Sequence, residues 1–117
     1  MGILDKVKGF VLGLKDIDVS GNMHVGSLRD EFKKNFGTEL RVYKTLGRGA
    51  NRADPKQTLA SICDKKVEGL TIKKSDTVGD IEDQFKNKMG IGIQIMKPNG
   101  EDFAPNSTRL KDVAEMK

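Results

Sequence analysis

The sequence predicts an α+β fold built from two tandem βαββ(α) repeats, and two observations carry this prediction. The stretch TVGDIEDQFKNKMG at 77–90 is preceded, 53 positions earlier, by the similar stretch HVGSLRDEFKKNFG at 24–37. Within each copy the spacing of apolar residues changes from two to three or four, which indicates a strand followed by a helix. With 36% hydrophobic and 32% charged residues, the composition is that of an ordinary globular protein.

The similarity between the two copies extends over most of the chain. At a shift of 53 both glycines and apolar residues coincide, and after a two-residue deletion the match continues at a shift of 51. An internal duplication explains this agreement. The matched pairs include Ile17 and Leu70, Gly26 and Gly79, Phe32 and Phe85, Gly37 and Gly90, Val42 and Ile95, Ala53 and Ala104, and Leu59 and Leu110.

Each copy predicts the same order of elements. A short strand, at 17–19 or 70–72, precedes a helix whose N-cap in the second copy is Thr77, with Asp80 completing a capping box. Gly37 and Gly90 stand where a helix ends in a left-handed residue. A second strand (ELRVYK or GIQIMK), a turn (PNG in the second copy), a short edge segment near Ala53 or Phe103 and a last helical turn (TLASI or RLKDV) follow.

The sequence divides into three parts, 1–14, 15–66 and 67–117. A half of this size buries too little surface to be stable alone, so we expect the two repeats to pack as one domain about a pseudo-twofold axis. A ferredoxin-like βαββαβ sheet, which ignores the short edge segments, is the alternative topology.

The segment 1–14 predicts a short amphipathic helix, which we expect to dock on the domain or on a second copy. Contact with a membrane surface is the less favoured interpretation, since the segment carries charges and is too short to span a bilayer. Its apolar stripe consists of Ile3, Leu4, Val7, Phe10, Val11 and Leu14.

The stretch SDTVGDIEDQFKNKMGI at 75–91 resembles the strand–helix–turn part of ubiquitin-like β-grasp proteins, and LKDV at 110–113 resembles the short turn that closes such folds. The resemblance implies a β-grasp-like arrangement in each repeat. Neither copy has a full opening hairpin, and the chain ends in AEMK without the Gly-Gly tail of conjugated relatives. The segment FG…LRVY at 36–43 also resembles that of small two-repeat bacterial proteins of uncharacterised function.

The reactive residue types do not form a recognisable catalytic or metal-binding set. The single cysteine, Cys63, cannot form an internal disulfide and points to a reducing, cytoplasmic location. With one histidine, His24, there is no Cys/His zinc set, and GRGANR at 47–52 lacks the Lys-Ser/Thr of a phosphate-binding loop. We therefore expect no enzyme activity, no metal and no cofactor.

The two copies differ in charge. From Lys15 to Lys66 eleven basic and seven acidic residues give +4, whereas from Val67 to Lys117 eight basic and nine acidic residues give −1. The contrast is greatest after the second strand of each copy. The candidate partner-binding residues are Arg41, Tyr43, Lys44, Arg48, Arg52 and Lys56, and Glu101 and Asp102 form a candidate second interaction surface.

Two functions fit this charge pattern. The first is a non-enzymatic protein-interaction or self-assembly module whose basic loop meets an acidic surface, such as the second-copy loop of another molecule. The second is a nucleic-acid-binding protein whose basic loop contacts phosphates. The first is favoured, because a net charge of +4 and 5% aromatic residues provide a weak field and few stacking platforms.

Overall fold

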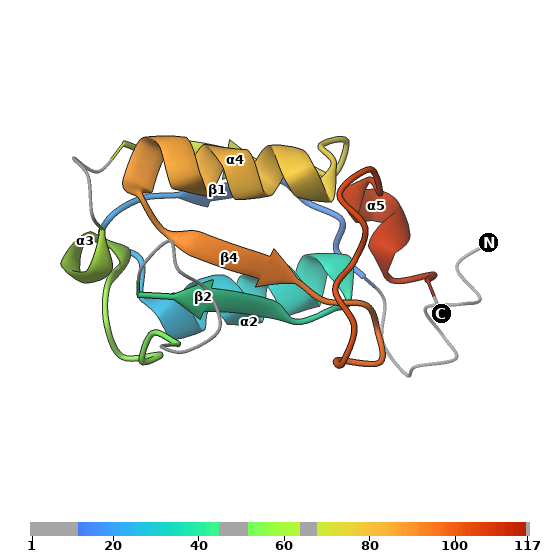
Figure 1. Ribbon diagram of the computed structural model, residues 1–117, viewed down its shortest axis with the longest axis horizontal. Coiled ribbons are helices and arrows are strands. Elements are labelled where there is room, and N and C mark those ends of the chain that lie inside the picture. The colour runs from blue at the N-terminus through green and yellow to red at the C-terminus, as the bar shows by residue number, and fades with distance from the viewer. Residues whose placement is uncertain (1–11, 45–51, 64–67, 117) are drawn as a thin grey trace.

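The computed structural model describes residues 12–44, 52–63 and 68–116, which form a small α+β fold of four strands and four helices. The elements follow the order β1 (Ile17–Val19), α2 (Val25–Phe36), β2 (Leu40–Tyr43), α3 (Leu59–Ile62), β3 (Leu70–Ile72), α4 (Val78–Met89), β4 (Gly92–Ile95) and α5 (Leu110–Val113). Strands β2 and β4 cross the centre of the molecule side by side, while α3 and α5 lie at opposite ends (Figure 1).

The strands form two antiparallel pairs. In the first, β1 pairs with β3, with Asp18 opposite Thr71; in the second, β2 pairs with β4, with Arg41 opposite Gln94. Each pair thus takes one strand from 15–66 and one from 67–117. The ferredoxin-like alternative requires a single four-stranded sheet, and the described strands do not form one. A β-grasp sheet would pair strands of the same half, which neither described sheet does.

The predicted edge segments are shorter than strands. Arg52 makes an isolated bridge to Tyr43, and Phe103 makes one to Met96. At the first segment, Ala53 N–H donates to the Val42 carbonyl. At the second, Ala104 N–H donates to the Ile95 carbonyl and Lys97 N–H donates to the Asp102 carbonyl.

The two long helices begin and end for identifiable reasons. At α4, Thr77 Oγ1 accepts from the Asp80 N–H while the Asp80 carboxylate accepts from the Thr77 N–H, so the predicted capping box is confirmed. The hydrogen bond from the Thr77 backbone N–H, and after it one with the Thr77 side chain, hold the pKa of the Asp80 carboxyl below its usual value. His24, at the matching position of α2, makes no side-chain cap. Gly37 (φ 82°) and Gly90 (φ 67°) end the helices in the left-handed conformation, as predicted.

One hydrophobic core joins both halves. The apolar faces of α2 and α4 are fully buried, and Phe32 packs against Phe36 with ring centroids 5.0 Å apart. The short helices close the core through Leu59, Ile62, Leu110 and Val113.

The predicted N-terminal helix lies almost wholly outside the described residues, as do Ile3, Leu4, Val7, Phe10 and Val11. Leu14, the last residue of the predicted stripe, is in non-helical chain with φ 49° and packs against the core. None of the described helices is long and apolar enough to cross a membrane.

Candidate functional site

Three arginines converge on one carboxylate, that of Glu39. Arg29 Nη2 lies 3.0 Å and Arg52 Nη1 3.3 Å from Glu39 Oε2, and Arg41 Nε lies 3.4 Å from Glu39 Oε1. The Arg41 Nε contact is an ion pair without hydrogen-bond alignment, since this atom is buried and has no hydrogen-bond partner among the described residues. One carboxylate thus organises three guanidinium groups and leaves a positive excess.

The local chain geometry explains this convergence. Gly37 ends α2 in the left-handed conformation, so the chain turns directly into β2 and brings Glu39 back toward Arg29 on the helix. Arg29 Nε also donates to the Leu40 carbonyl at 3.0 Å, which fixes the guanidinium against the strand. Glu39 and Arg41 share one side of the strand, because side chains alternate along it.

The cluster is partly exposed, and its members differ in accessibility. The side chain of Arg52 is 46% exposed, that of Arg29 31% and that of Arg41 22%. Ion pairs with this much exposure contribute little to stability individually. Arg52 therefore has the most freedom to contact a partner while its guanidinium remains oriented by Glu39.

Arg41 connects the cluster to the turn of the second half. Its Nη2 donates to the Gly100 carbonyl at 2.9 Å. In the same turn, the Asn99 side-chain oxygen accepts from the N–H groups of Glu101 and Asp102, at 2.8 and 3.1 Å. The structure therefore places the predicted acidic residues beside the arginine cluster, not on a remote face.

The other predicted site residues are dispersed. Tyr43 is buried in β2, while Lys44 and Lys56 are exposed. The Lys56 N–H donates to Asp54 Oδ1 at 2.8 Å within a turn. Arg48 lies outside the described residues.

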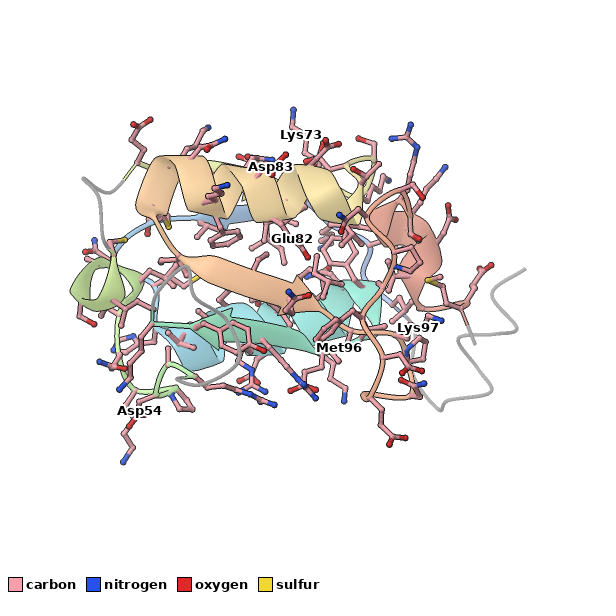
Figure 2. All side chains as sticks on the ribbon, in the orientation of Figure 1. Asp54, Lys73, Glu82, Asp83, Met96 and Lys97 are labelled. Atoms are coloured by element: carbon pink, nitrogen blue, oxygen red, sulfur yellow. The ribbon has the colours of Figure 1, made fainter. Side chains whose placement is uncertain are left out.

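A groove of about 590 Å³ runs between α2 and the turn Lys97–Gly100. Figure 2 shows Lys97 at the right of the molecule and Asp54 at its lower left, with Asp83 of α4 at the top. The groove is lined by Gly26, Arg29, Asp30, Lys33, Gly37, Thr38, Glu39, Leu40, Pro55 and 97–100.

A second groove, of about 490 Å³, lies beside β3 and is charge-balanced. Asp18 and Asp76 line it together with Lys73 and Lys88. The groove next to α2 has three basic residues, Arg29, Lys33 and Lys97, and two acidic ones, Asp30 and Glu39, of which Glu39 is already shared by three arginines. Positive charge is thus concentrated on the α2 side.

The residue types that usually perform catalysis are few and scattered in the described part of the chain. Burial raises the pKa of the Cys63 thiol, which disfavours the nucleophilic thiolate. His24 is exposed at the start of α2. The described residues contain no group of three or more His, Cys, Asp or Glu side chains suited to a metal ion.

Sequence reasoning missed Arg29, Lys33, Thr38, Glu39 and Lys97 as site residues. A signal was present in the comparison of the two copies. At a shift of 53, Arg29 corresponds to Glu82, so the charge contrast extends from the loops to the long helices.

The chain was also compared with known proteins. No family model, curated protein or solved structure matches it.

Proposed function

We propose that this chain is a non-enzymatic protein-interaction module that binds an acidic surface of another protein. The surface that binds, here termed the basic surface, consists of Arg29, Lys33, Arg41, Arg52 and Lys97. The observation that carries the proposal is the convergence of three guanidinium groups on Glu39, which leaves them oriented and in excess over the local carboxylate charge.

The physical argument concerns preorganisation. Free arginine side chains lose rotamer freedom when they bind, and this loss weakens association. Here the Leu40 carbonyl restrains Arg29 and the Gly100 carbonyl restrains Arg41, so much of that ordering accompanies folding. Planar guanidinium groups form paired hydrogen bonds with carboxylates, which suits recognition of Asp and Glu side chains.

The fold we infer for this module is a pair of repeats related by a pseudo-twofold axis. Its support is the strand register, in which Asp18 pairs with Thr71 and Arg41 with Gln94, residues that are each 53 positions apart. Corresponding backbone hydrogen bonds also recur in the two repeats. Val25 N–H donates to Gln57 and Val78 N–H donates to Thr108, at 2.8 Å in both cases. The β-grasp resemblance stays limited to the order of strand, helix and strand.

The arrangement favours a separate acidic partner over head-to-tail self-assembly. A head-to-tail contact needs its two complementary surfaces on different sides of the molecule. Arg41 instead contacts Gly100, directly before Glu101, so the basic surface and the acidic turn are neighbours. A cytoplasmic location stays a prediction that rests on the lone Cys63.

Nucleic-acid binding remains the second candidate, because phosphates would also meet the basic surface. The groove offers no aromatic side chain for base stacking among its lining residues. Of the described large hydrophobic residues, only Phe103 is exposed, and it is not part of that lining. These features favour carboxylates over nucleotides.

The test compares two probes, poly-L-glutamate and a single-stranded DNA of similar length, across a range of salt. Wild-type protein should bind the polypeptide more tightly than DNA. Arg52→Glu should weaken this binding about tenfold, equivalent to about 1.4 kcal/mol. Lys73→Glu, at an exposed lysine on the opposite edge (Figure 2), is the control and should change the affinity less than about twofold. Tighter binding of DNA with a steep salt dependence would favour the second candidate.

A further inference from the structure

We propose that the groove between α2 and the turn Lys97–Gly100 seats an extended acidic segment of the partner protein. This inference rests on the proposed function and assigns the binding path, which runs along α2. The groove joins the basic surface through Arg29, Lys33 and Lys97, which all line it.

The charges of the groove fit an acidic peptide. Neither Lys33 nor Lys97 forms an ion pair with another described residue, so both ammonium groups can form an ion pair with a carboxylate of the peptide. Of the two acids in the lining, Glu39 is shared by three arginines and Asp30 opposes the incoming charge, while Glu101 and Asp102 follow directly after the turn that forms the other wall. A segment with two or more carboxylates would therefore find cations on both walls.

The dimensions suit extended chain. The stretch of α2 from Gly26 to Lys33 is about 10 Å long at about 1.5 Å per residue. An extended peptide covers this length with about three residues, at about 3.3 Å each. Of the glycines that line the groove, Gly100 is the one where an added Cβ would meet no atom within 4 Å, so the turn has open space for a ligand backbone there.

A buried hydroxyl gives independent support. Thr38 lines the groove and is 2% exposed, yet its Oγ1 has no hydrogen-bond partner among the described residues. A buried hydroxyl without a hydrogen-bond partner destabilises the folded state, and most buried hydroxyls in proteins have a partner. A peptide N–H or carbonyl in the groove would supply the missing partner.

The second half of the molecule supplies a matched control. Lys86 occupies the same place in α4 that Lys33 occupies in α2, 53 positions earlier, and both are exposed. Lys86 does not line the groove. Lys33→Glu and Lys86→Glu thus make the same change of charge at equivalent helix positions, and only the first lies on the proposed path.

The experiment measures the affinity of the full chain for a fluorescein-labelled hexaglutamate peptide by fluorescence anisotropy. Lys33→Glu and Lys97→Glu should each weaken binding at least about fivefold, while Lys86→Glu should stay within about twofold. Thr38→Val should weaken binding about threefold without lowering the melting temperature, because it removes an unpaired hydroxyl and keeps the side-chain volume.

The outcomes separate this inference from the proposed function. Equal losses of peptide affinity for Lys33→Glu and Lys86→Glu would contradict binding in the groove and would indicate a general electrostatic attraction. If Arg52→Glu weakens binding and Lys33→Glu and Lys97→Glu do not, the acidic partner binds at the arginine cluster, and the groove is not its binding path. A wild-type protein that does not bind the peptide at millimolar concentration contradicts both. A loss of thermal stability in Thr38→Val would show that its hydroxyl has a structural partner.

Discussion

Helices α2 and α4 share their buried side and differ on their exposed side. Both contain twelve residues, end in a left-handed glycine and bury residues at matching positions, with Val25, Leu28, Phe32 and Phe36 corresponding to Val78, Ile81, Phe85 and Met89. On the outer side, Arg29 of α2 joins the Glu39 cluster, whereas the matching residue of α4 is Glu82.

This comparison separates folding from binding within one chain. Matching buried positions keep two helices packed on one core, so they report on the fold. The exposed positions are free of that constraint, and their charges differ in sign at Arg29 and Glu82. Because of this difference in charge, we place the binding surface on the α2 side.

The largest expected effect follows from separating the halves. Expressed alone, 15–66 and 67–117 should each be largely unfolded, because each would lose the partner strand of both of its strands and expose half of the core. Circular dichroism during heating measures this. A cooperative melt of either half would show two independent domains.

Next in size is the truncation of the matched phenylalanines. Phe32→Ala and Phe85→Ala should each lower the free energy of unfolding by about 3–5 kcal/mol, since both side chains are fully buried. Urea unfolding provides the measurement. A loss below about 1 kcal/mol at either site would mean that the two helices do not contribute comparably to one core.

Glu39→Gln should act in opposite directions on stability and binding. Removing the carboxylate leaves Arg29, Arg41 and Arg52 mutually repelling, and we expect a loss of about 1–2 kcal/mol, kept small by the partial exposure of the pairs. The loss of stability should shrink in high salt. Affinity for the hexaglutamate peptide should rise, because a competing carboxylate is gone while the Leu40 and Gly100 carbonyls still orient Arg29 and Arg41. Reduced affinity in a folded variant would contradict the proposed role of the basic surface.

The smallest effects concern the helix starts. Thr77→Ala should cost about 1 kcal/mol, since it removes half of the capping box, while His24→Ala should be close to neutral because His24 makes no side-chain cap. The Asp80 pKa is lowered in the folded state, so its stabilising contribution is present at neutral pH and is lost as the pH falls through about 4 and below. The difference in the free energy of unfolding between wild type and Thr77→Ala should therefore become smaller at acidic pH.

Local signals made much of the fold predictable. The change of apolar spacing located β1, α2, β3 and α4, and Thr77, Gly37 and Gly90 marked helix boundaries, because capping and left-handed backbone depend on nearby residues. The pairing of β1 with β3 and of β2 with β4 could not be predicted from such local signals. Strands of three or four residues fit several partners, and the choice among them is tertiary.

The candidate site was predictable only in part for the same reason. Arg41 and Arg52 were recognised from the basic composition of their segment. Glu39, Arg29 and Lys97 join them through folding, since Arg29 comes from a helix and Lys97 from the other half of the chain. A charge count along the sequence cannot show which carboxylate pairs with which base.

The central claim is that the α2 side of the molecule is the binding side, and the glycines of the two halves can test it together. A ¹H–¹⁵N correlation spectrum recorded during titration with the hexaglutamate peptide should show shifts at the amides of Gly26, Gly37 and Gly100, which line the groove. The amide signals of Gly79 and Gly90, the matching glycines of α4, should not shift. Equal shifts in both sets, or shifts confined to Gly79 and Gly90, would contradict the account.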